Sequence, residues 1–363
     1  MRCQLVVAIS FLANAALADS ILVQVVGDGR QERGGPSAEA TEYEALQKLF
    51  RVDLETGKVT ASQNIGARAL VSVAAKRGSL FVLSSGKKGP ELAEIALRDL
   101  TSLRVDSVHA DLGYDPYFDS FGRQVPDGPV ALLPGGEMVV VSQTAAPDLK
   151  EAIVAFDRSK RVELMVLGTS ESHPTLLDYG DTVLAIFYHG HGALLKLSGT
   201  SAERVDHPGF SPLSYSGTGY LARVEQTESS RSLLAVTTVG LLLERDLDPR
   251  GTVYKPIRIV PEGKDYGFVQ DIASHRKGTV AAVLYASRQN VRDSLVVVDL
   301  VQRQVSTVRE LPTGTSCVLI RDNGAIVLGQ ESSLLVLSDP NPKPVLLLDG
   351  SRIINLFHIP GGA

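Results

Sequence analysis

A short apolar run that ends at an aspartate, followed by a polar turn and a second run, decides the fold. It reads Leu49-Phe50-Arg51-Val52-Asp53-Leu54-Glu55-Thr56-Gly57-Lys58-Val59. Similar segments occur at residues 153–162 and 295–305. An aspartate at the end of a strand suits a turn, because its carboxylate accepts hydrogen bonds from nearby backbone N–H groups. Each of these segments therefore predicts a β-hairpin.

This hairpin belongs to a larger repeat of about 48 residues. Degenerate copies of it occur at residues 94–105, 194–205, 241–259 and 334–348. Most hairpins follow a pair of apolar runs around a turn, most clearly at residues 130–141. Four short strands per repeat are typical of propeller blades. The sequence predicts an all-β fold, a seven-bladed β-propeller of four-stranded antiparallel blades.

The first repeat has only three strands, at residues 21–26 and in the hairpin around Asp53. The C-terminal run Arg352 to Gly362 matches the first strand and turn of the third repeat, residues 130–136. We expect the C-terminal strand to pair with the N-terminal blade and close the propeller. Closure of this kind removes free sheet edges.

Residues 1–18 have the features of a signal peptide. Arg2 gives a positive n-region, residues 5–15 form an apolar stretch, and Ala16-Leu17-Ala18 is a cleavage site. The apolar stretch is short for a membrane span, so we expect a secreted or periplasmic protein after cleavage near Ala18. Residues 19–363 then form a single β-propeller domain. The best candidate helix is short, Glu42 to Lys48.

Composition excludes several classes of protein. The chain has 363 residues, is 44% hydrophobic and contains two cysteines, so it can bury a large core without a disulfide framework. A formal net charge of −5 argues against binding to nucleic acid or to anionic membranes. Cys317 falls in a predicted inner strand, where a small buried apolar side chain is expected.

No catalytic motif names a reaction. Cys-x-x-Cys-His, which attaches c-type haem, is absent, and so is the Gly-x-Ser-x-Gly nucleophile elbow. The absence of tryptophan separates the chain from WD40 repeats. Its units of strand, Asp turn and strand, such as Phe50 to Val59, resemble the divergent YVTN-type and amine-dehydrogenase-heavy-chain-like propellers. That resemblance covers most of the mature chain and implies a fold, but it carries no catalytic residue across.

In a propeller, the connections from the second to the third strand of each blade lie on one face of the molecule. The connections from the fourth strand to the first strand of the next blade lie on the same face. We call it the upper face, and ligand sites usually occupy it. One of its long predicted connections, residues 113–128, concentrates aromatic and acidic side chains, which favours binding. The alternative is that these aromatic rings fill the mouth of the central channel that the blades of a propeller surround. The candidate ligand-binding residues are Tyr114, Asp115, Tyr117, Phe118 and Asp119.

Histidines gather in the fourth repeat. By strand position, His173 could approach His189 or His191 around a shared ion, and neutral imidazoles are good ligands for transition metals. The alternative is that they are ordinary surface histidines. The sequence predicts no cofactor, and a divalent metal at these histidines is the alternative that it leaves open.

These observations favour a ligand- or protein-binding scaffold without chemistry of its own. Its partner would be a protein or a small molecule on the upper face. One alternative is a metal-dependent hydrolase of the propeller lactonase type, with Asp119, His173, Asp271 and Asn355 as candidates by position. Another is a non-catalytic subunit of a periplasmic redox complex.

Overall fold

A computed structural model describes the strands and many of their connections. The described residues are 20–27, 46–74, 78–86, 89–108, 130–132, 138–145, 150–157, 160–166, 175–179, 182–186, 192–198, 201–207, 221–226, 232–237, 239–246, 252, 254–288, 292–337, 342–348 and 351–359. The chain divides into two compact units, one formed by Met1–Ser107 with Gly329–Ala363 and the other by Val108–Leu328. Prediction of a single domain over residues 19–363 stays a prediction.

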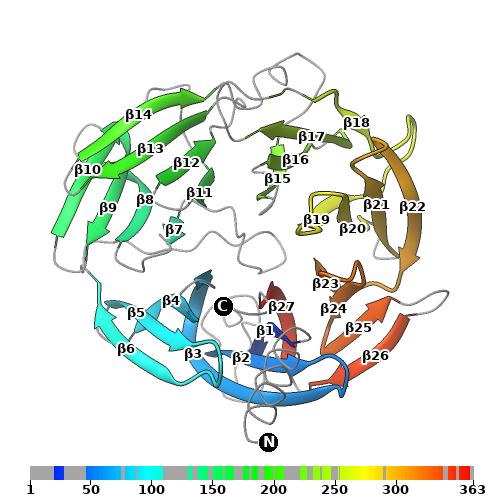
Figure 1. Cartoon of the computed structure of the whole chain (residues 1–363), viewed down its shortest axis with the longest axis horizontal. Helices are drawn as coiled ribbons and strands as arrows, with labels where there is room; N and C mark the ends of the chain where they lie inside the picture. Colours follow the sequence, from blue (N-terminus) through cyan, green and yellow to red (C-terminus); the bar gives the residue numbers. More distant parts are fainter. Residues whose placement is uncertain are drawn as a thin grey trace, which may run out of the picture. The chain divides into compact units, whose positions relative to one another are not determined.

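All secondary structure among the described residues is β-strand (Figure 1), and the strand pairs whose register is described are antiparallel. Five sheets have four strands each. They are β7 (Val130–Leu132), β8 (Met138–Ala145), β9 (Lys150–Asp157) and β10 (Lys160–Val166); β11 (Thr175–Tyr179), β12 (Thr182–Ile186), β13 (Gly192–Ser198) and β14 (Ser201–His207); β15 (Leu221–Gln226), β16 (Ser232–Thr237), β17 (Leu241–Asp246) and β18 (Ile257–Arg258); β19 (Phe268–Ser274), β20 (Val280–Ala286), β21 (Asp293–Asp299) and β22 (Gln304–Leu311); and β23 (Thr315–Ile320), β24 (Ile326–Gln330), β25 (Ser333–Leu337) and β26 (Pro342–Leu347).

The sixth sheet has seven strands in the order β27-β1-β2-β3-β4-β5-β6. Its members are β1 (Ser20–Gly27), β2 (Leu46–Asp53), β3 (Lys58–Ala74), β4 (Ser79–Gly86), β5 (Gly89–Ala96), β6 (Ser102–Ser107) and β27 (Ser351–His358). The long strand β3 pairs with β2 through its first part and with β4 through its second part. It therefore serves as the fourth strand of one set and the first strand of the next. The count of seven blades and the closure of a ring stay predictions.

The C-terminal strand β27 pairs with the N-terminal strand β1, as shown by the red and blue strands of Figure 1. The register runs from Ile21 opposite His358 to Gly27 opposite Ser351, with an irregularity between Gln24 and Val25. Ile21, Leu22 and Val23 are almost completely buried. The two ends of the described chain are thus joined in one sheet.

The Asp turns have the geometry expected from the sequence. Oδ1 of Asp53 accepts hydrogen bonds from the backbone N–H groups of Glu55 and Thr56, at 2.9 and 3.0 Å. Asp299 does the same for Val301 and Gln302, at 2.9 and 2.8 Å. In both turns the fourth residue after the aspartate has a positive φ. The shared aspartate therefore fixes the same turn in two repeats.

The positive-φ position contacts the preceding sheet in both turns. At Gly57, a Cβ atom would lie 2.4 Å from the carbonyl oxygen of Val345 on β26, so only glycine fits. Arg303 occupies the same position with φ of 56°, in the left-handed region that is unfavourable for a residue with a Cβ atom. Arg303 therefore needs contacts that offset this backbone conformation.

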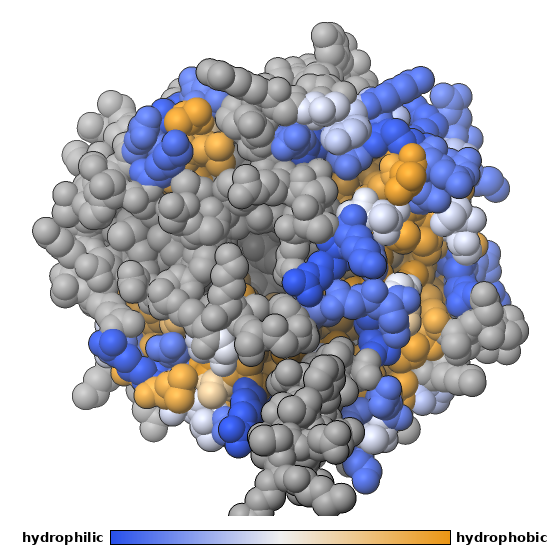
Figure 2. Space-filling model, in the orientation of Figure 1, coloured by the Kyte–Doolittle hydropathy of each residue, from blue (hydrophilic) through white to orange (hydrophobic). Residues whose placement is uncertain are grey.

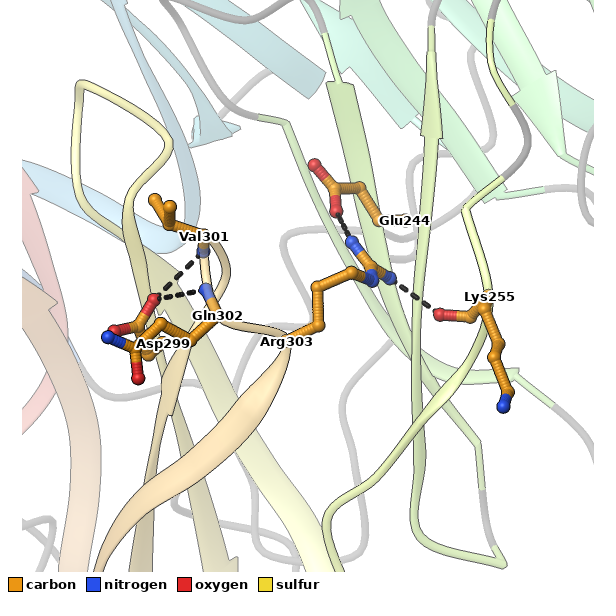
Figure 3. Close-up of polar contacts among 6 residues, drawn as sticks. All are labelled: Glu244, Lys255, Asp299, Val301, Gln302 and Arg303. Atoms are coloured by element: carbon orange, nitrogen blue, oxygen red, sulfur yellow. Dashed lines mark hydrogen bonds and ion pairs between the residues drawn. The ribbon is translucent and has the colours of Figure 1, made fainter.

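Those contacts reach the sheet β15–β18 (Figure 3). Arg303 Nη1 lies 2.6 Å from Glu244 Oε2, and its Nη2 donates to the carbonyl oxygen of Lys255 at 2.6 Å. Its guanidinium carbon also lies 5.0 Å from the ring centroid of Tyr254. Only 10% of the Glu244 side chain is exposed, so this pair is screened less than a surface pair. The cluster holds consecutive sheets together.

The apolar core lies between consecutive sets of four strands, which in the first unit are the two parts of the seven-stranded sheet. In the second unit, one buried cluster combines residues of β16 and β17, including Leu234 and Leu242, with residues of β20 and β21, including Val283 and Val296. In the first unit, Leu22 and Leu49 pack with residues of β3, β4 and β5. Strands β1 and β20 are buried along nearly their whole length, which explains the continuous apolar runs of the repeats.

A polar network is buried within the seven-stranded sheet. Gln24 Nε2 donates to Gln47 Oε1 at 2.7 Å and to the carbonyl oxygen of Ala69 at 2.9 Å. The N–H of Ala69 donates to Gln47 Oε1 at 3.2 Å, and Asn355 Nδ2 donates to Gln24 Oε1 at 3.0 Å. Ala69 lies where the pairing of β3 with β4 is irregular. Two side-chain amides thus satisfy backbone groups that the ladder leaves unpaired.

The candidate helix at Glu42 to Lys48 was wrong for its described part. Leu46, Gln47 and Lys48 begin strand β2, in which exposed and buried residues alternate at the start. Leu46 is 61% exposed, whereas Gln47 is almost completely buried. Pairing with β1 on one side and β3 on the other overrides the helical propensity of these residues.

Candidate ligand-binding face

The sheet β19–β22 shows how the connections divide between its two ends. Phe268, at the start of β19, pairs with Ala286 at the end of β20, and Asp293 pairs with Leu311. The connections before β19, after β20 and after β22 therefore leave from this end. We call it the upper end of the sheet, because these are the connections that the sequence assigns to the upper face. The turn at Asp299 lies at the opposite end.

A half-exposed aromatic ring marks the upper end. Phe268 is 49% exposed, although it is the first residue of a strand whose later residues Ile272 and Ala273 are buried. The guanidinium carbon of Arg288 lies 4.8 Å from the centroid of the Phe268 ring. Arg288 Nε also lies 3.6 Å from Asp265 Oδ2. The stacked arginine keeps an apolar ring and a cation side by side at the surface.

The loop that carries Phe268 is held by its backbone. Oδ1 of Asp265 accepts a hydrogen bond from the N–H of Gly267 at 2.8 Å. Gly267 has φ of 99°, and a Cβ atom there would lie 1.9 Å from the carbonyl oxygen of Ala286. The loop approaches β20 so closely that only glycine fits. The backbone that carries Phe268 is therefore held against β20.

Tyr266 anchors the same loop in the core. Its ring packs edge-on against Tyr285, with a distance of 5.7 Å between the centroids. Burial raises the pKa of the Tyr285 hydroxyl, and the neighbouring Tyr266 raises it further. Tyr285 is consequently a neutral side chain at physiological pH. Tyr266 of this loop therefore packs against the core, whereas Phe268 is exposed to solvent.

Asp293 secures the other connections at the upper end. This carboxylate is 4% exposed. Its Oδ1 accepts from the N–H of Ser287 at 3.2 Å and its Oδ2 from the N–H of Thr315 at 3.0 Å. A buried carboxylate that accepts two backbone N–H groups fixes both segments. Asp293 thereby holds the start of the connection after β20, which carries Arg288, and the start of β23.

Asp271 and Asn355, which the sequence offered as metal ligands by position, have structural roles. The two residues occupy equivalent positions in their strands. Asp271 of β19 lies opposite Leu284 of β20, and Asn355 of β27 lies opposite Gln24 of β1. Oδ2 of Asp271 accepts from the N–H of Val318 at 2.9 Å, and its Oδ1 from the N–H of Ile272 at 3.0 Å. Asn355 donates to Gln24, as described above. Both side chains bind first-strand backbone or the buried amide network.

The other residues that the sequence predicts for a site lie outside the described residues. They are Tyr114, Asp115, Tyr117, Phe118 and Asp119 for the ligand, and His173, His189 and His191 for a metal. Within the described ranges, no group of three or more His, Cys, Asp or Glu side chains could hold a metal ion. Likewise, no helix in the described part is long and apolar enough to cross a membrane. Cys317 is buried on β23, as predicted.

Sequence reasoning missed Phe268, Arg288 and Asp265, because they belong to no motif and are 23 residues apart along the chain at their extremes. One signal was present. The tripeptide Tyr266-Gly267-Phe268 places two aromatic rings around a glycine directly before an apolar run. A glycine between two aromatic residues at the start of a strand is a position where the backbone approaches a neighbour closely.

Comparison with known proteins identifies the fold only. No family model matches the chain, and no curated protein matches it. Among solved structures, the chain is similar to apo AztD from Citrobacter koseri, with 10% identity and a TM-score of 0.54 over 93% of this chain and 97% of that one. It is also similar to a proposed 6-phosphogluconolactonase from Bacteroides fragilis, with 11% identity and a TM-score of 0.56 over 93% and 97%.

A third similar structure is hydrazine synthase from Kuenenia stuttgartiensis, with 13% identity and a TM-score of 0.50 over 83% of this chain and 90% of that one. These proteins bear three unrelated descriptions, and identities this low show the fold alone. The series of four-stranded antiparallel sheets and the similarity to these solved structures indicate the same fold. The chain is a divergent β-propeller.

Proposed function

We propose that the protein is an exported β-propeller that binds a protein or small-molecule ligand through its upper face and does no chemistry of its own. The observation that carries this proposal is the arrangement of Phe268 and Arg288. Aromatic rings and arginines are enriched in the cores of binding interfaces, and here the backbone that carries both is held in place before any ligand arrives.

The supporting structure around this pair favours a binding role. Gly267 and Asp265 fix the backbone on one side, and Asp293 fixes it on the other. Such a surface loses little conformational entropy when a ligand covers it. The connection at residues 113–128 belongs to the same proposed face on sequence grounds, with Tyr114, Asp115, Tyr117, Phe118 and Asp119 as further contacts.

Site-specific photo-cross-linking tests the proposal. Phe268 is replaced by the photoreactive residue p-benzoylphenylalanine in the exported protein, whose N-terminal residue is expected to be Asp19. Val301, which is 72% exposed and lies at the opposite end of the same sheet, carries the probe in the control. After irradiation in cells, we expect a mass-shifted adduct from position 268 and none from position 301.

The size of the adduct then separates a small molecule from a protein partner. The same probe at Tyr117 tests whether residues 113–128 share the face. Absence of an adduct at position 268, or equal adducts at positions 268 and 301, would contradict the proposal. The thermal unfolding temperature of each variant should equal that of the unmodified protein, which checks that the replacement leaves the fold intact.

A further inference from the structure

The outer strand β6 has an exposed apolar stripe. It is the last strand of the seven-stranded sheet, and no described strand pairs with its outer edge. Leu103 is 60% exposed and Val105 is 55% exposed. In a strand, residues two apart share a face, so these side chains stand next to each other. Figure 2 shows a small hydrophobic area among hydrophilic residues over this end of the sheet.

The opposite face of β6 carries an ion pair. Arg104 Nε lies 2.8 Å from Asp106 Oδ2 and 3.0 Å from Asp106 Oδ1. Ser102 lies on the same face and is within 3.4 Å of Gln63 on β3. Edge strands usually avoid pairing with other chains by means of charged side chains. Here the two charges neutralise each other within one strand, and the apolar stripe is left unprotected.

We propose that β6 pairs edge to edge with β6 of a second copy of this chain. The pairing is antiparallel and centred on Val105. Arg104 then lies opposite Asp106 of the partner subunit, and Asp106 lies opposite Arg104 of the partner subunit. On the other face, Val105 meets Val105 of the partner subunit. The strand is therefore complementary to itself in charge on one face and in hydrophobicity on the other.

Two physical arguments support a second copy as the occupant. Opposite charges directly across an antiparallel pair stabilise it, and like charges destabilise it. A two-fold axis repeats each contact, so a surface that matches itself forms a closed dimer. Centring the pair on any other residue places Arg104 opposite an uncharged residue or opposite itself. The sequence Arg104-Val105-Asp106 thus selects one register.

Strand β14 provides a matched comparison. It contains the same triplet as Arg204-Val205-Asp206, with Arg204 Nε 2.6 Å from Asp206 Oδ1. Val205, however, is only partly exposed, whereas Val105 is more than half exposed. The ion pair is common to both strands, but the exposed apolar stripe belongs to β6. We therefore expect pairing through β6 and none through β14.

Sedimentation velocity on the purified mature protein, from about 1 to 200 µM, tests this proposal. A six-residue edge buries less area than a permanent interface, so a reversible dimer within this range is expected. Val105→Lys should abolish it, because it buries a charge at the two-fold axis. The control Val205→Lys should leave it unchanged.

Charge-reversal variants test the predicted register of the two strands. Arg104→Asp or Asp106→Arg alone places like charges opposite each other and should weaken the dimer about tenfold or more. The double variant Arg104→Asp with Asp106→Arg restores opposite charges and should restore dimerisation. A monomer at all concentrations, a dimer that survives Val105→Lys, or a double variant no better than the single ones would overturn the proposal.

Discussion

Replacing Gly267 with alanine is expected to lower the free energy of unfolding by about 3 kcal/mol or more. Two effects combine at this position. The φ of 99° is unfavourable for any residue with a Cβ atom, and that atom would lie 1.9 Å from the carbonyl oxygen of Ala286. Because the obstacle is backbone, no side chain can move aside. The loop must shift, and Tyr266 and Phe268 shift with it.

Gly324→Ala is the matched control. Gly324 also has a positive φ, of 83°, but a Cβ atom there would meet nothing within 4 Å. Its replacement should cost about 1 kcal/mol, the backbone term alone. Urea denaturation of both variants measures the difference. Equal losses would show that the loop can move away from β20, and Phe268 would then not be fixed by its backbone.

Replacing Gln47 with leucine is expected to destabilise the protein by about 2 to 4 kcal/mol. Gln47 Oε1 accepts from Gln24 Nε2 and from the N–H of Ala69. Leucine fits a similar volume but accepts no hydrogen bond. Ala69 and Gln24 are both completely buried, so each would lose its partner without gaining water. A buried donor left unpaired costs more than the bond itself contributes.

A double-mutant cycle distinguishes this network from simple packing. Gln24→Leu removes the other amide, and the double variant should be less destabilised than the sum of the two single variants. The control Gln63→Leu changes a partly exposed glutamine of β3 whose side chain donates to Ser102 at 3.4 Å, and it should cost about 0.5 kcal/mol or less. Additive losses for the two buried glutamines would mean that they act independently.

The sequence was informative where one residue type dictates local geometry. Asp53 and Asp299 predicted hairpins because an aspartate at a strand end can cap a turn, and both caps are present. The match between residues 352–362 and an earlier first strand predicted the pairing of β27 with β1. Both inferences depend on short-range chemistry or on repetition, and a single sequence records these directly.

Long-range polar contacts could not be predicted. Nothing in the sequence shows that Arg303 would adopt a positive φ and reach Glu244 and Lys255 of the preceding sheet. Gln24, Gln47 and Asn355 meet only because three strands lie side by side. The helix expected at Glu42 to Lys48 is wrong for residues 46–48, because pairing with β1 and β3 outweighs local propensity there.

The candidate site illustrates the same limit. The aromatic residues at 114–118 and the histidines at 173–191 were prominent because they are concentrated in the sequence. Phe268 and Arg288 lie far apart in the sequence, and the pairing of β19 with β20 brings them together. A binding surface on a repeat fold is assembled from the ends of several strands, so sequence clustering is a poor guide to it.

The pairing of the C-terminal strand β27 with β1 joins the two ends of the described chain in one sheet. Native-state hydrogen exchange, followed by mass spectrometry, tests this directly. Amides of residues 351–358 should be protected as strongly as those of residues 20–27, and the two segments should lose protection at the same denaturant concentration. Rapid exchange in residues 351–358 while β1 and β2 remain protected would contradict the account.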